Sequence, residues 1–171
     1  MSTEPQYLLL PANRAFIAFT LVTAFVLDLL PWGRTTWTPD LLALVLVFWS
    51  VHQPRTVGIG IAFLFGLLMD VHEAGLLGEK ALTFSLLSYG GISLHRRVPW
   101  FGTAGKMLHV FALLLAANVI ASLVRLALGS GLPGWSLLLA SASTAVLWPL
   151  AEAMLLAPQR RAIERDETRP I

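Results

Sequence analysis

Cysteine is absent from this chain of 171 residues, and charged residues make up only 13% of it. Without cysteine there is no disulfide framework, no thiol nucleophile and no cysteine metal site. The formal net charge is only +2, so the charge balance does not indicate a nucleic-acid partner. No internal repeat of fixed period and no low-complexity segment stands out.

Catalytic signatures are missing as well. His72-Glu73 begins like the HExxH helix of a zinc protease, but position 76 is leucine where that motif needs its second histidine. No serine lies in a nucleophile elbow, and no glycine pattern forms a phosphate-binding loop. The sequence therefore predicts a protein that is not an enzyme and carries no cofactor.

Hydrophobic residues, in contrast, make up 56% of the chain, and its mean hydropathy is +0.72. These values lie well outside the range of ordinary soluble domains. The apolar runs are continuous, unlike the strands of outer-membrane barrels, which alternate over about ten residues. We therefore predict an all-α integral membrane protein that forms a single polytopic domain over residues 1–171.

Six apolar runs predict a bundle of about six transmembrane helices. They cover residues 15–30, 39–51, 57–71, 76–94, 104–128 and 135–157. The second and third are shorter than the ~20 residues of a straight span, so either flanking residues complete them or they form a re-entrant pair. Two spans are favoured, because a re-entrant tip would hold Arg55 at membrane depth.

The distribution of basic residues orients this bundle by the positive-inside rule. With both termini cytoplasmic, the inner side receives Arg14, Arg55, Arg96, Arg97, Lys106, Arg160, Arg161, Arg165 and Arg169. The outer side keeps Arg34, Lys80 and Arg125. Residues 158–171 are then a basic cytoplasmic tail, which by default contacts the anionic lipids of the bilayer. His72 falls opposite the other three histidines, so a shared metal site is not expected.

A stripe of small residues organises the third run. Gly58, Ala62, Gly66 and Asp70 are spaced by four and therefore share one helix face, which ends in a carboxylate. Small residues let another backbone come close in a membrane, where apolar attraction between helices is weak. The stripe either packs this helix inside its own bundle or docks a helix of another protein.

Several polar side chains lie near the predicted outer ends of the helices: Asp28, Asp70, Glu79, Lys80 and Arg125. Because intramembrane charges usually find partners, we expect Arg125 to turn inward and neutralise Asp70 or Asp28. The alternative is that Arg125 extends to the interface while Asp70 lies among the headgroups. Asn118 and Ser122 share the helix face of Arg125.

The last run carries a second polar face, which contains Thr144, Trp148 and Glu152 beside Pro149. A kinked polar face of this kind either lines a ligand path or packs against neighbouring helices.

In these features the chain resembles the MreD family of rod shape-determining membrane proteins, over essentially its whole length. The resemblance rests on the six short spans and on Pro39-Asp40, GLLMDVHEAGLLGEKAL at 66–82, SLLSYGGISLHRRVPWF at 85–101 and Leu108-His109-Val110. Asp70, Gly75 and Gly78 fall where the family has its acid and its glycine-rich turn. None of these stretches is a catalytic motif.

The resemblance implies a non-enzymatic scaffold in the bacterial inner membrane, within the elongation complex that inserts peptidoglycan along the side wall. MreC, with one span and a periplasmic domain, is the implied direct partner. The actin-like MreB, the glycosyltransferase RodA and a class B penicillin-binding transpeptidase are implied in the same complex. The resemblance also implies a fold similar to the S-components of energy-coupling-factor vitamin transporters.

Within that reading, we expect the segment from Asp70 to Lys80, with Gly75, Gly78 and Glu79, to meet the juxtamembrane part of MreC. A small-molecule transporter or substrate-binding membrane subunit is the alternative function, and Asn118 at mid-helix is its strongest residue. A lipid-handling protein is a third possibility, since grooves between short helices can hold acyl chains.

Overall fold

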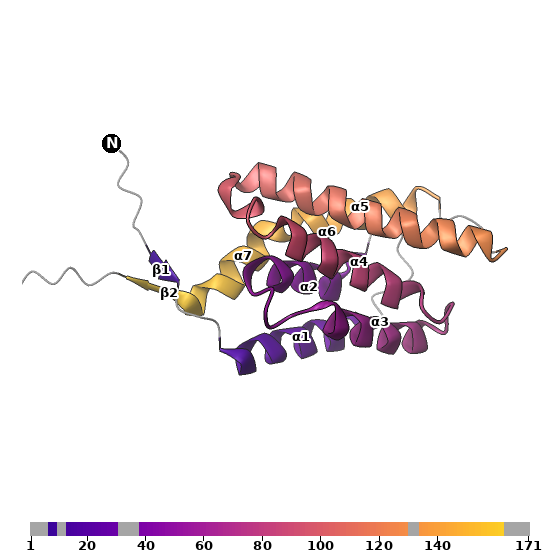
Figure 1. The fold of residues 1–171 in the computed structure, drawn as a ribbon, viewed down its shortest axis with the longest axis horizontal. Coiled ribbons are helices and arrows are strands. Elements are labelled where there is room, and N and C mark those ends of the chain that lie inside the picture. Colours follow the sequence, from indigo (N-terminus) through magenta and orange to yellow (C-terminus); the bar gives the residue numbers. More distant parts are fainter. Residues whose placement is uncertain (1–6, 10–12, 31–37, 130–133, 163–171) are drawn as a thin grey trace, which may run out of the picture.

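The computed structural model describes residues 7–9, 13–30, 38–129 and 134–162, which form a bundle of helices elongated along one axis (Figure 1). The α-helices are α1 (Arg14–Asp28), α2 (Leu41–His52), α3 (Ile59–Glu73), α4 (Glu79–Leu94), α5 (Thr103–Ala127), α6 (Ser136–Val146) and α7 (Trp148–Leu156). Short 3₁₀ turns are η1 (Val98–Trp100) and η2 (Ala157–Gln159), and short strands are β1 (Tyr7–Leu9) and β2 (Arg160–Ala162). The helical fold class is confirmed.

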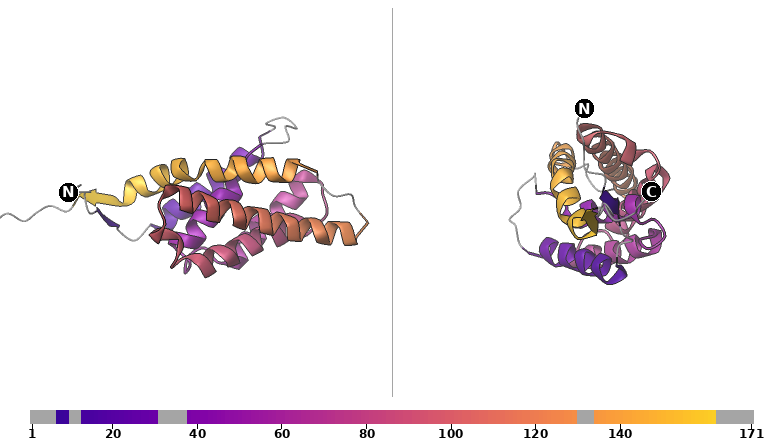
Figure 2. Two further views of the ribbon diagram at one scale, coloured as in Figure 1. Left: turned by 90° about the horizontal axis from the view of Figure 1, so that it is seen from above. Right: turned by 90° about the vertical axis from the view of Figure 1, so that its left-hand side faces the viewer.

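Each of the six apolar runs contains helix, but the last run contains two. α6 ends at Val146 and α7 begins at Trp148, and Pro149 lies in the first turn of α7. Proline has no N–H to continue the ladder, and its ring displaces the carbonyl four residues earlier, so the helix breaks here. Figure 2 shows α5 and the α6–α7 segment running side by side along the bundle.

The helix α2 forms the centre of the core. Nine of its twelve residues are buried, on all sides of the helix, by α1, α4, α6 and α7. The core also satisfies the polar atoms that α2 carries. The indole of Trp49 donates to Thr20 Oγ1 at 2.9 Å, and the hydroxyl of Ser50 donates to that of Ser88 at 3.1 Å. A helix that is apolar on every face is suited to the middle of a bundle.

Among the described residues, two helical stretches are long and apolar enough to cross a membrane: α5 and the segment from Ser136 to Gln159. α2 is a shorter apolar helix. The remaining predicted spans, the six-span topology and the cytoplasmic placement of the termini stay predictions.

The strands β1 and β2 form a feature that the sequence did not predict. They pair antiparallel, with Leu8 opposite Arg161, and so join the segment before α1 to the segment after α7. The α3–α4 turn lies at the opposite end of the molecule (Figure 1). The predicted basic tail thus begins in η2 and β2, and its remainder, residues 163–171 with Arg165 and Arg169, lies outside the described residues, as does Arg34.

Candidate functional site

Acidic side chains gather where α1 and α3 end and α2 and α4 begin. We call this region the acidic end, and it consists of Asp28, Asp40, Asp70, Glu73 and Glu79, with the cations Lys80 and Arg125. Five carboxylates meet two cations here, so the region carries a net negative formal charge.

At the α1–α2 junction, two carboxylates cap the start of α2. Asp28, the last residue of α1, accepts hydrogen bonds from the backbone amides of Leu41 at 3.2 Å and Leu42 at 2.7 Å. Asp40 is the N-cap of the same helix and accepts from the amide of Ala43 at 2.8 Å. The first amides of a helix have no partner within it, and its N-terminus carries a partial positive charge, so anionic caps are stabilising there.

At the α3–α4 junction, Asp70 caps the start of α4. Its side chain lies in the last turn of α3, is only 3% exposed, and accepts from the amides of Gly78 at 2.8 Å, Lys80 at 2.7 Å and Ala81 at 3.3 Å. Hydrogen bonds to an ionised carboxylate are roughly twice as strong as those between neutral groups. The three hydrogen bonds to Asp70 offset the free-energy cost of burying its carboxylate.

The expected pairing of Arg125 with Asp70 or Asp28 is wrong. Arg125 Nη1 lies 3.3 Å from Glu79 Oε1 instead, which links α5 to α4. The two aspartates are occupied by backbone amides of the following helices, which leaves Glu79 as the partner. Asp28 and Asp70 lie nine or more positions before the helices that they cap. Sequence rules for helix capping consider only residues next to the helix start, so they do not predict these two caps.

Lys80 joins the two junctions. Its Nζ lies 3.5 Å from Asp40 Oδ2 and 3.3 Å from Glu73 Oε1, while its backbone amide donates to Asp70. One residue of α4 is therefore tied to the start of α2 and to the end of α3. Lys80 was among the site residues predicted from the sequence, whereas Asp40 and Glu73 were not.

The small-residue stripe packs against α4. A Cβ atom placed on Gly66 would lie 2.6 Å from the backbone nitrogen of Ala81 and 2.7 Å from the carbonyl oxygen of Lys80, so only glycine allows this approach. Ala62 is also buried, whereas Gly58 precedes α3 as its N-cap and has open space beside it. From Ala62 to Asp70 the stripe therefore faces its own bundle.

The turn between α3 and α4 depends on Gly78. Its φ is +100°, a value that residues with a Cβ rarely adopt. This conformation lets the chain turn back so that the amides of Gly78 and Lys80 point at Asp70. Gly75 is exposed, and a Cβ atom there would meet no neighbour within 4 Å.

The remaining polar residues selected from the sequence connect helices elsewhere. Asn118 Nδ2 lies 3.4 Å from Ser141 Oγ and links α5 to α6, and Ser122 is buried on the same side. Glu152 of α7 forms an ion pair with Lys106 of α5, at 2.5 Å between Oε1 and Nζ. Both polar faces of the sequence analysis therefore take part in helix packing.

Two of the four histidines, His52 and His109, pack against aromatic rings. His52 stacks on Phe48 with ring centroids 4.1 Å apart, and His109 stacks on Phe101 at 4.4 Å. Within the ranges that the structure describes, no three histidine or carboxylate side chains converge as metal ligands would.

Comparison with known proteins adds an independent line of observation. The family model of the rod shape-determining protein MreD matches residues 12–157. A rod shape-determining protein MreD of Haemophilus influenzae is 34% identical over 134 residues, covering 75% of this chain and 80% of that protein. No solved structure matches the chain, so the likeness to energy-coupling-factor S-components stays a prediction.

Proposed function

Because the chain belongs to the MreD family of rod shape-determining proteins, we propose that it is a non-enzymatic scaffold of the bacterial inner membrane. Membership of this family of membrane proteins implies a role in determining rod shape and association with the rod-shape complex. In the proposed role, the protein supports side-wall peptidoglycan synthesis by binding MreC. MreB, RodA and a class B penicillin-binding transpeptidase belong to the same complex.

The observation that carries this proposal is the combination of a rigid acidic end with an apolar helix face that leads to it. On α3, the side chains of Leu64, Leu68 and Val71 are spaced by four and three, so they share the side away from α4, and all are exposed. We call these three residues the α3 face. Glu73, at the end of the same helix, lies on the side toward α4, where it pairs with Lys80, and its side chain is 43% exposed.

The α3 face has the composition that a single-span partner needs. The α3 face can pack along a transmembrane helix, and the acidic end next to it can attract a cationic juxtamembrane segment of the same partner. The internal ion pairs and caps hold Glu73 and its neighbours in one arrangement before any partner arrives, which reduces the ordering cost of binding.

The transporter alternative receives less support from the described residues. Asn118, its strongest residue, is hydrogen-bonded to Ser141 between two helices, and Glu152 is paired with Lys106. The polar groups that would have to line a transport path are therefore engaged in contacts between helices.

The proposal is tested by purifying the tagged protein in mild detergent from a rod-shaped host and identifying its companions by mass spectrometry. Recovery of MreC together with the wall synthases supports the scaffold. Recovery of ATPase subunits or of a bound metabolite in their place would instead favour transport.

A further inference from the structure

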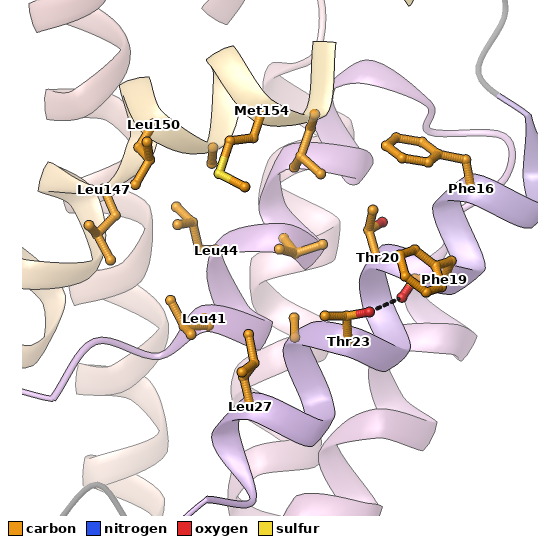
Figure 3. Close-up of a pocket in the computed structure, with 14 residues that line it drawn as sticks. Phe16, Phe19, Thr20, Thr23, Leu27, Leu41, Leu44, Leu147, Leu150 and Met154 are labelled. Carbon is orange, nitrogen blue, oxygen red and sulfur yellow. Dashed lines mark hydrogen bonds between the residues drawn. The ribbon is translucent and has the colours of Figure 1, made fainter. Parts of the chain in front are cut away.

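An apolar groove runs along α1 on the side that faces α2 and α7 (Figure 3). Its volume is about 340 Å³. The wall on α1 contains Phe16, Thr20, Thr23 and Leu27, and the other walls contain Leu44 of α2 and Met154 of α7. The groove is open on one side, and its lining is almost entirely apolar.

The two hydroxyl groups of the groove are not available to a ligand as donors. Thr20 Oγ1 donates to the carbonyl oxygen of Ile17 and accepts from the indole of Trp49. Thr23 Oγ1 donates to the carbonyl oxygen of Phe19 at 2.8 Å. An occupant that fits this lining must therefore be apolar along its length.

The length of the groove suits an acyl chain. Phe16 and Leu27 are eleven positions apart on α1, which is about 16 Å along the axis at 1.5 Å per residue. This length matches one leaflet, or half of a hydrocarbon core about 30 Å thick.

The charge of the two groove ends gives the occupant a direction. Asp28 follows Leu27 directly and Asp40 lies beside it on α2, so one end of the groove is anionic. At the other end, Arg14 begins α1 and is exposed, so that end carries a cation. An anionic headgroup is attracted to the basic end and repelled by the acidic end.

We propose that the groove binds one acyl chain of an anionic phospholipid, whose phosphate lies at the basic end near Arg14. The lipid enters from the leaflet on that side and stays bound when the surrounding bilayer is removed. This site is separate from the α3 face and does not depend on MreC.

The test uses the purified full-length protein, stripped of lipid and titrated with dioleoyl phosphatidylglycerol or dioleoyl phosphatidylcholine under native mass spectrometry. We expect one phosphatidylglycerol per chain, held at least about tenfold more tightly than phosphatidylcholine. Thr23→Trp fills the groove and should abolish this binding. Val22→Trp is the matched control, because Val22 is exposed on α1 outside the groove, and it should bind as the wild type does.

A second arm places the photo-crosslinker benzoylphenylalanine at position 19 in cells, where it replaces a phenylalanine that lines the groove and is 67% exposed. A phospholipid adduct supports the site, whereas an adduct with a protein segment would show that a helix covers the groove and would overturn the proposal. Arg14→Gln should weaken phosphatidylglycerol binding, while Arg55→Gln, at an exposed loop position away from the groove, should not. Equal binding of the two lipids, or unchanged binding in Thr23→Trp, would also overturn it.

Discussion

The carboxylate of Asp70 accepts a hydrogen bond of 2.7 Å from the backbone amide of Lys80, the second residue of the helix that follows. The same lysine carries its ammonium group to Asp40 and Glu73. Asp28 makes an equivalent bond of 2.7 Å to the amide of Leu42, the second residue of α2. The helix pairs α1–α2 and α3–α4 are thus joined in the same way. In each pair, an aspartate at the end of the first helix caps the start of the second.

Replacing Asp70 with Asn should destabilise the protein. The amide keeps one acceptor oxygen but loses the charge that three backbone amides and the α4 N-terminus stabilise, at a cost of about 1–3 kcal/mol. Thermal unfolding of the purified protein in detergent measures the difference. Glu73→Gln is the control, because its ion pair with Lys80 is partly exposed and contributes at most about 1 kcal/mol. Equal stability of Asp70→Asn and wild type would show that the cap does not contribute.

Replacing Gly66 with Leu should destabilise the protein by at least about 1–3 kcal/mol, because the side chain must enter the backbone of α4. The control is Gly60→Leu in the same helix, where a Cβ meets no neighbour within 4 Å. Cellular abundance and thermal unfolding measure both. If Gly66→Leu leaves the protein abundant and abolishes copurification with MreC, the stripe docks a partner instead of α4.

The pairing of Arg125 with Glu79 predicts a charge-swap result. Glu79→Arg and Arg125→Glu should each lower stability slightly, by up to about 1 kcal/mol for a partly exposed pair. The double variant should recover most of the loss. A charge swap between positions 70 and 125 should not recover stability, because the partners of Asp70 are backbone amides. If stability recovers in the 70/125 swap and not in the 79/125 swap, Arg125 pairs with Asp70, as the sequence suggested.

Removing one partner of the Lys106–Glu152 pair should be more harmful than removing both. Lys106→Met leaves the carboxylate of Glu152 little exposed and unpaired, which costs on the order of 3–5 kcal/mol. Replacing both residues with Met should be close to neutral, since apolar groups of similar size need no partner. The unfolding temperatures of the single and double variants measure the two losses of stability. Additive losses would mean that the two residues act independently.

The helices could be predicted from the apolar runs. Pro149 indicated a kink in the last run, where the structure has two helices in place of the single predicted span. The Gly66 contact was also predictable in kind, because small residues at a spacing of four indicate close packing. The partners of Asp28, Asp70 and Arg125 were not predictable, since they depend on how the chain returns between helices. Between α3 and α4 the φ of Gly78 helps to set that path, and no spacing rule gives the direction in which the following amides point.

The α3 face should carry the contact with MreC. Leu68→Trp enlarges a side chain that is 52% exposed and should lower recovery of MreC several-fold without changing protein abundance. Leu123→Trp on α5 is the matched control, with a similarly exposed leucine on another helix. Equal loss in both variants would point to a general effect on the bundle, and no loss in either would place the contact elsewhere.

The most direct test of the scaffold itself is quantitative mass spectrometry of what copurifies with the tagged wild-type protein after mild extraction from a rod-shaped host. The proposed function predicts MreC at near-equal amounts, accompanied by RodA and its transpeptidase. Purification without MreC, in company with ATPase subunits or a bound small molecule, would contradict it.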